Sequence, residues 1–230
     1  MNIKNNSLKI IDAWKSALQN RFFSLKLFLF PILFIIYSAI TQQLGNYIEA
    51  RQGIRLEDKL LMIFPSRDFS IEIFILLYSS LFLLVITHLS KPAVILRIIE
   101  MHFLVAVVRQ ICILMVALEP PAGMIILRDV FLENTIYPQN SPLTKDLFFS
   151  GHVASIWIYF LCSQKKYLKY SMLVASVAMS FMILSMRVHY TYDVFGAMAF
   201  TTAIYFVPLL TRQYFTKTKE YTTVLLPNRR

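Results

Sequence analysis

The sequence predicts an all-α polytopic membrane protein with six transmembrane helices, preceded by an N-terminal amphipathic helix that lies on the membrane surface. The first observation behind this prediction is the composition of the 230-residue chain, which is 57% hydrophobic and only 16% charged. Soluble domains are about a quarter charged, so this chain lacks the polar surface that a water-soluble globule needs. The second observation is a series of six apolar stretches, each close to the length that crosses a bilayer.

Residues 1–21 form the predicted surface helix. Ser7 can cap this helix, since its hydroxyl can accept from a free backbone N–H. Four apolar residues then follow at helical spacing: Leu8, Ile11, Trp14 and Leu18. Lys9 and Lys15 lie off this apolar stripe, as in helices that rest on anionic headgroups. The segment is therefore expected to lie on the cytoplasmic surface of the membrane.

The transmembrane domain is predicted to comprise residues 22–211, with a basic cytoplasmic tail over 212–230. Its six spans are expected at 22–44, 71–88, 94–118, 148–162, 171–188 and 194–210. The fourth span is shorter than the roughly 20 residues that cross the hydrocarbon core. It is therefore expected to be buried among the other helices, with its first turn opening into a water-filled pocket. Lys91-Pro92 marks the break between the second and third spans.

Lysine and arginine are unevenly distributed between alternate connections. The N-terminal segment, the second and fourth connections and the tail are net positive, whereas the first connection is balanced and the third is net negative. Positive charge near a span stays in the cytoplasm, so both termini are predicted to be cytoplasmic and connections one, three and five to face outward. The basic runs are topology signals, and nucleic acid is not expected as a partner. The compact length favours a bacterial inner membrane.

Two of the four histidines lie in polar motifs next to predicted spans. His152 lies where the third connection enters the fourth span, and His189 lies in the short fifth connection, so both are expected on the outward side. Asp193 follows His189 by four residues, and a sixth helix that begins before His189 puts the two on one face, one turn apart. A carboxylate there can fix the imidazole tautomer and leave the other nitrogen free as nucleophile or base. His88 and His102 are expected to be satisfied by helix neighbours or at the interface.

Four further residues are candidate phosphate ligands. Ser150 and Gly151 precede a predicted helix, where backbone N–H groups favour an anion. Arg109 lies inside the third span, where a guanidinium costs at least ~2.5–3.5 kcal/mol, so it binds either phosphate or a carboxylate on another helix. Arg187, two residues before His189, either binds phosphate or lies solvated at the interface.

These residue types suit phosphoryl transfer through a phosphohistidine. One imidazole attacks phosphorus, a second protonates the departing oxygen, and the guanidinium and backbone amides hold the remaining oxygens. The sequence contains no nucleotide-binding loop, zinc-protease motif or carboxylate cluster, so neither a metal nor another cofactor is expected.

Two motifs resemble those of the type 2 phosphatidic acid phosphatase superfamily, and most closely its sphingomyelin-synthase branch. They are Asp146-Leu-Phe-Phe-Ser-Gly-His152 and His189-Tyr-Thr-Tyr-Asp193-Val, in the same order and spacing as in that branch. A third motif, from Arg109-Gln-Ile to Pro-Pro-Ala-Gly123, is similar to the branch's arginine followed by an apolar run and a proline-glycine turn. The resemblance covers residues 94–211, and the six-span layout agrees with it.

The resemblance implies His189 as the nucleophile, Asp193 as the residue that orients it, and His152 as the acid and base. The phosphatase branch also has an arginine well upstream of the second histidine. Arg187 lies too close to His189 to match it, which leaves phosphate binding to Arg109. Val153 stands where a threonine is usual after the first catalytic histidine.

The predicted activity is that of a metal-independent lipid phosphotransferase or phosphatase that acts on a phospholipid or sphingolipid in the outer leaflet. The expected partners are a phospholipid donor, membrane lipids and, for headgroup transfer, ceramide or another lipid alcohol as acceptor. Hydrolysis and transfer both remain open, because the choice depends on whether the pocket excludes water and admits a second lipid. The alternative is a non-catalytic lipid-binding or transport protein, although the chain has no internal repeat typical of transporters.

Overall fold

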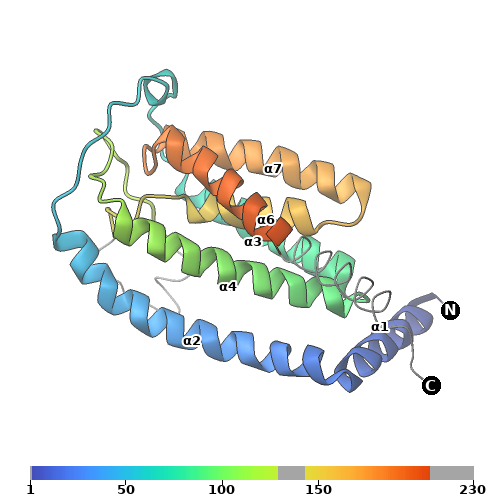
Figure 1. Ribbon diagram of the computed structural model, residues 1–230. Helices are drawn as coiled ribbons and strands as arrows, with labels where there is room; N and C mark the ends of the chain where they lie inside the picture. Colours follow the sequence, from blue (N-terminus) through green and yellow to red (C-terminus); the bar gives the residue numbers. More distant parts are fainter. Residues whose placement is uncertain (1, 129–142, 208–230) are drawn as a thin grey trace, which may run out of the picture.

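The computed structural model describes residues 2–128 and 143–207, and these residues form a bundle of α-helices (Figure 1). No strand occurs among the described residues, so the predicted all-α class is confirmed. The helices are α1 (Asn2–Gln19), α2 (Arg21–Ala50), α3 (Ser70–His88), α4 (Pro92–Met115), α6 (Gly151–Cys162) and α7 (Lys166–Ser185), with a short 3-10 turn η1 (Leu61–Ile63) and a last helix over 191–207.

Four of these helices are long and apolar enough to cross a membrane, namely α2, α3, α4 and α7. The fourth predicted span corresponds to α6, which has only 12 residues. The last helix is described as far as residue 207, short of the predicted end of the sixth span. The apolar helices indicate an integral membrane protein, and the count of six spans stays a prediction.

The short helix α6 lies at the centre of the bundle. It packs against α3, α4 and α7, while α2 packs against the outer side of α4 (Figure 1). Half of its residues are buried: Val153, Ala154, Ile156, Ile158, Tyr159 and Cys162. The prediction that the short span is enclosed by other helices is therefore confirmed. By contrast, the most apolar part of α2 has no buried residue, as expected of a helix that faces lipid.

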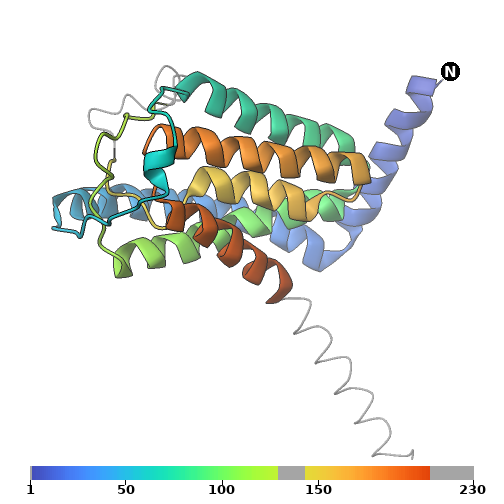
Figure 2. The ribbon, with the colours of Figure 1, turned by 90° about the horizontal axis from the view of Figure 1, so that it is seen from above.

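Helix α1 lies at one end of the bundle, beside the turn between α3 and α4 (Figures 1 and 2). Its Trp14 indole N–H donates to the carbonyl of Leu89 at 2.8 Å. Asn20 separates α1 from α2 and caps α2, because its side chain accepts from the N–H groups of Phe22 and Phe23. Leu8, Ile11 and Leu18 are exposed on α1. The position of this helix on a membrane surface stays a prediction.

The connections predicted to face outward gather at the other end (Figures 1 and 2). There an isolated parallel bridge joins Ile54 of the first connection to Leu118 of the third, through two hydrogen bonds of 3.0 Å that Ile54 makes with Ala117 and Glu119. Gly53 allows this close approach, since a Cβ at this position would lie 2.6 Å from the carbonyl carbon of Leu118. The side chains of Lys145 and Glu119 form an ion pair of 2.8 Å. The outer connections are thus tied to each other and to the segment that enters α6.

Pro92 begins α4, so the predicted break at Lys91-Pro92 is confirmed. Proline is favourable at this position because the first N–H groups of a helix have no partner within the helix.

Candidate active site

His189 and Asp193 form a buried pair. Nδ1 of His189 lies 3.2 Å from Oδ2 of Asp193, and the two residues are 5% and 0% exposed. A carboxylate only accepts hydrogen bonds, so the ring proton lies on Nδ1. The lone pair is then on Nε2, as a nucleophilic or basic imidazole requires.

The local structure around this pair differs from the one expected. The last helix begins at residue 191, so His189 lies before the helix and not on its first turn. The chain turns after α7 through Arg187, whose φ of 54° is left-handed, and this turn delays the start of the helix. The contact forms nonetheless, because Oδ2 of Asp193 also accepts from the N–H of Tyr190 at 2.9 Å. Asp193 therefore holds both the imidazole and the start of the helix.

Ser150 joins the two histidine motifs. Its backbone N–H donates to the carbonyl of Asp193 at 3.2 Å, and its side chain accepts from the N–H of Val153 as the N-cap of α6. The N–H of Ser150 is thus used within the protein, and the N–H of Gly151, at the start of the helix, is the candidate donor to an anion. His152, the second residue of α6, lies at this junction.

Arg109 reaches from α4 to the segment that enters α6. Its Nε donates to the carbonyl of Phe149 at 2.6 Å, and its Nη2 contacts both the carbonyl and the carboxylate of Asp146, at 3.1 and 3.0 Å. Nη1 takes part in none of these contacts. Arg109 therefore pairs with a carboxylate, which belongs to a connection and not to another helix, and within residues 2–128 and 143–207 no hydrogen bond uses its Nη1.

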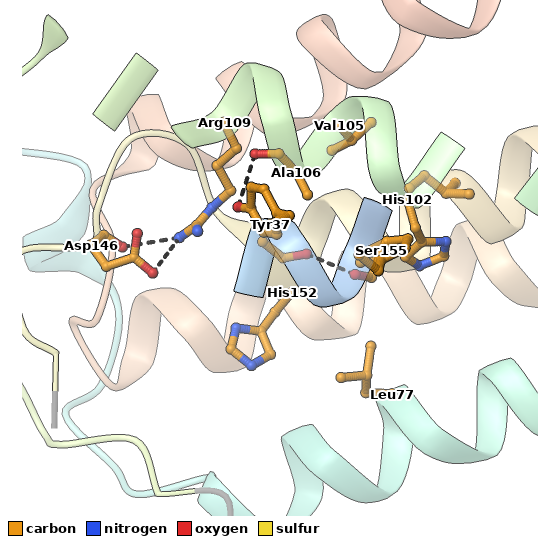
Figure 3. A pocket seen from close by; sticks show the side chains of 12 residues that line it. Tyr37, Leu77, His102, Val105, Ala106, Arg109, Asp146, His152 and Ser155 are labelled. Carbon is orange, nitrogen blue, oxygen red and sulfur yellow. Dashed lines mark hydrogen bonds and ion pairs between the residues drawn. The ribbon is translucent and has the colours of Figure 1, made fainter. Parts of the chain in front are cut away.

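A cavity of 310 Å³ brings several of these side chains together (Figure 3). Arg109, Gly151 and His152 line it together with Asp146. The ring of His152 also packs edge-on against Phe74, with 5.6 Å between the ring centroids. The expectation that the first turn of the fourth span opens into a pocket is confirmed. His189 and Asp193 do not line this cavity; the hydrogen bond from Ser150 connects them to it.

Arg187 lies elsewhere. It lines a second cavity, of 480 Å³, together with Arg55 and Tyr190, and its Nη1 donates to the carbonyl of Ala122 at 3.2 Å. Gly123 has a φ of 73°, a left-handed conformation that favours glycine, and a Cβ there would also lie 2.8 Å from Nη1 of Arg187. The structure does not bring Arg187 to the cavity of Arg109, and a phosphate-binding role for it stays a prediction.

Tyr190 supports the turn that carries His189. Its hydroxyl donates to the carbonyl of Glu119 at 2.8 Å and accepts from the N–H of Leu56 at 3.2 Å. Burial raises the pKa of the Tyr190 phenol, so it stays protonated as this arrangement requires. The turn is thereby attached to both outer connections.

Four polar residues near His152 were not among the predicted site residues: Tyr37, His102, Asp146 and Ser155. Asp146 begins one of the motifs quoted above, so the sequence carried a signal for it. Tyr37, from α2, and Ser155, from α6, lie in otherwise apolar spans, and no local pattern marks them. His102 bonds to the carbonyl of Ile98 at 2.9 Å, and His88 to that of Leu84 at 2.9 Å, so the predicted helix-neighbour partners of both are confirmed.

Part of the chain matches a model of a known protein family. No curated protein and no solved structure matches the chain. Residues 145–209 match the model of the family described as PAP2 superfamily C-terminal, and this segment contains both histidine motifs. Proteins of this superfamily are phosphatase-type enzymes, so the match suggests phosphatase or phosphotransferase activity on lipids. The match covers 65 of the 230 residues and supports a likeness of this segment to the type 2 phosphatidic acid phosphatase superfamily.

Proposed function

We propose that this protein is a metal-independent lipid phosphotransferase or lipid phosphatase, similar to the sphingomyelin synthases, that works through a phosphohistidine on His189. The observation that carries the proposal is the buried pair of His189 and Asp193, together with the hydrogen bond that the N–H of Ser150, at the start of α6, donates to the carbonyl of Asp193. This bond links the nucleophile and orienting residue to the helix that carries His152. The substrate is a phosphorylated lipid of the outer leaflet.

In the first step, Nε2 of His189 attacks phosphorus as the bond from phosphorus to the lipid oxygen breaks. His152 in its protonated form gives its proton to that oxygen, and the lipid alcohol leaves. Attack places positive charge on the imidazole of His189, which the carboxylate of Asp193 stabilises at 3.2 Å.

The phosphoryl oxygens carry negative charge throughout this step. Nη1 of Arg109 and the N–H of Gly151 are the donors available to them, and the N-terminus of α6 adds the positive end of its dipole. Donors that are already fixed by packing stabilise a developing charge without reorganising.

In the second step, His152 takes a proton from an attacking hydroxyl, whose oxygen bonds to phosphorus as the bond to Nε2 breaks. Water as the attacking group completes hydrolysis, and a lipid alcohol such as ceramide completes headgroup transfer from a phospholipid donor. Both routes regenerate His189 and the proton on His152.

The test is to incubate the purified full chain with labelled phosphatidic acid and labelled phosphatidylcholine, with and without ceramide, in excess EDTA. Released phosphate indicates hydrolysis, and labelled sphingomyelin indicates transfer. We expect one of these products in EDTA, because the scheme uses only side-chain and backbone groups.

Three variants test the roles of the residues. His189→Ala is expected to abolish turnover, and Asp193→Asn to lower it by roughly 10²–10⁴-fold because the charge beside the imidazole is lost. His88→Gln is the matched control, since His88 lies at the opposite end of α3 from the outer connections and bonds to Leu84. Full turnover by His189→Ala, or a strict requirement for a divalent ion, would contradict the proposal.

A further inference from the structure

The inner part of the cavity holds three polar side chains that the proposed chemistry does not use. They are Tyr37 from α2, His102 from α4 and Ser155 from α6, and the rest of this wall is apolar, including Phe34, Leu77 and Ile158 (Figure 3). Of the three, His102 is ionisable, and an ionisable side chain inside a membrane-spanning segment marks a functional site by default.

Each of the three side chains donates its hydrogen to a backbone carbonyl. The Tyr37 hydroxyl donates to Ala106 at 3.1 Å, and the Ser155 hydroxyl donates to Gly151 at 3.0 Å. What the two hydroxyls still offer to the cavity is lone pairs, which accept hydrogen bonds.

The same holds for His102, whose Nδ1 lies 2.9 Å from the carbonyl oxygen of Ile98. A carbonyl oxygen only accepts, so Nδ1 carries the hydrogen, and in the neutral ring Nε2 is then an acceptor. The neutral ring is favoured because a charged one would be buried between transmembrane helices. Within residues 2–128 and 143–207, no hydrogen bond reaches Nε2.

The cavity is therefore polarised along its length. At the outer end lie the donors, Arg109 and the N-terminus of α6, with the Asp146 carboxylate paired to Arg109. Ala106, which anchors Tyr37, is about one turn of α4 deeper than Arg109, and His102 is seven residues or about 10 Å deeper. Ser155 is likewise one turn into α6 from Gly151. A phosphate bound at the donors would place the backbone of its lipid beside the acceptors.

From this arrangement we infer that Tyr37, Ser155 and His102 select lipids whose backbone carries a hydrogen-bond donor, either a hydroxyl or an amide N–H. The inference rests on the proposed function, because it takes the outer end as the phosphate site. A lipid whose glycerol backbone carries two ester groups offers only oxygens that accept hydrogen bonds. These oxygens would face the acceptors of the cavity, and neither side would have a donor. Unpaired polar groups in an enclosed site lower affinity.

The experiment measures binding to the full chain carrying His189→Ala in lipid nanodiscs, so that the ligands are not consumed. Three phosphomonoesters compete with fluorescent phosphatidic acid: ceramide phosphate, which has an amide and a hydroxyl, lysophosphatidic acid, which has one hydroxyl, and phosphatidic acid, which has two esters. We expect ceramide phosphate to bind more tightly than phosphatidic acid. Strong binding of lysophosphatidic acid indicates recognition of the hydroxyl, and weak binding indicates recognition of the amide.

The added substitutions His102→Phe and Ser155→Ala are each expected to lower this preference by roughly threefold to tenfold, the effect of one neutral hydrogen bond. His102→Gln, which keeps an acceptor, should restore part of it. Leu77→Met is the control and should change the affinities for all three lipids alike. The preference is the ratio of two affinities measured on the same preparation. It therefore does not depend on how much of a variant is folded.

Equal or tighter binding of phosphatidic acid, or a preference that both substitutions leave unchanged, would overturn the inference. A third outcome separates this inference from the proposed function. If the His189→Ala chain binds lipids selectively but the wild type makes no product from any lipid, the proposed function is contradicted and the selection of lipids still holds.

Discussion

At the scale of single residues, Arg109 shows how a charge inside a span becomes useful. Its guanidinium is planar, and two of its nitrogens bond to Phe149 and Asp146 in different directions. A lysine has the same charge but one nitrogen on a flexible stem, so it cannot hold this segment and also reach a third group. The shape of the side chain therefore matters here as well as its charge.

Arg109→Lys is accordingly expected to lower turnover by about tenfold or more, although the charge is kept. The measurement is the rate of product formation by purified protein. Arg97→Lys is the matched control, because Arg97 lies on the same helix and contacts Tyr205 and Glu100, away from His152. Equal rates for the two variants would show that only the charge of Arg109 is needed.

At the scale of elements, the outer connections are bonded to one another over the end of the bundle that carries the histidine motifs. Glu119 is central to these bonds: its carboxylate accepts from Lys145 at 2.8 Å and from the N–H of Gly53 at 2.9 Å, and its backbone pairs with Ile54. The hydrogen bond from Lys145, followed by that from Gly53, lowers the pKa of Glu119. The contribution of this carboxylate to stability is therefore present above the ordinary glutamate pKa, near 4.3, and is lost as the pH falls through the lower pKa of the folded protein.

Glu119→Gln should thus lower the unfolding temperature at pH 7, and the gap from wild type should close as the pH falls below about 4. Thermal unfolding of the detergent-solubilised chain between pH 3 and pH 7 measures this. Glu57→Gln, in the exposed part of the first connection, is the control. A difference in unfolding temperature that stays constant over this pH range would mean that the charge of Glu119 does not stabilise the bonded outer connections.

At the scale of the whole molecule, alternate connections lie at opposite ends of the bundle. The turns between α3 and α4 and between α6 and α7 lie at the end of α1, and both histidine motifs lie at the other end (Figures 1 and 2). The basic connections are thus separated from the candidate active site by the length of the bundle. The distribution of positive charge predicts that the histidine end faces away from the cytoplasm.

Cysteines introduced at two exposed positions test this orientation, in a chain whose native Cys112 and Cys162 are replaced. Met62→Cys, at the histidine end, should react with a membrane-impermeant reagent in intact cells. Lys166→Cys, at the start of α7, should react only after permeabilisation. The reverse pattern would show that the protein is inserted the other way and that its substrate comes from the cytoplasmic leaflet.

The sequence by itself determined which segments are helical and at which end the two histidine motifs meet. These features depend on local quantities: the length of an apolar run, a proline at the start of α4, and the side on which positive charge gathers. The spacing of His189 and Asp193 also predicted their contact, although the contact comes from a turn and not from the first turn of a helix.

Only the tertiary structure decided what surrounds His152. Tyr37 and His102 lie in apolar spans, where nothing in the local sequence distinguishes a side chain that faces a cavity from one that faces lipid. Arg109 lines this cavity and contacts Asp146, whereas Arg187, the other arginine that the sequence offers as a phosphate ligand, lines a different cavity. The physical reason is that side chains far apart in the sequence meet only through the packing of their helices, and the register of that packing depends on all the contacts between them.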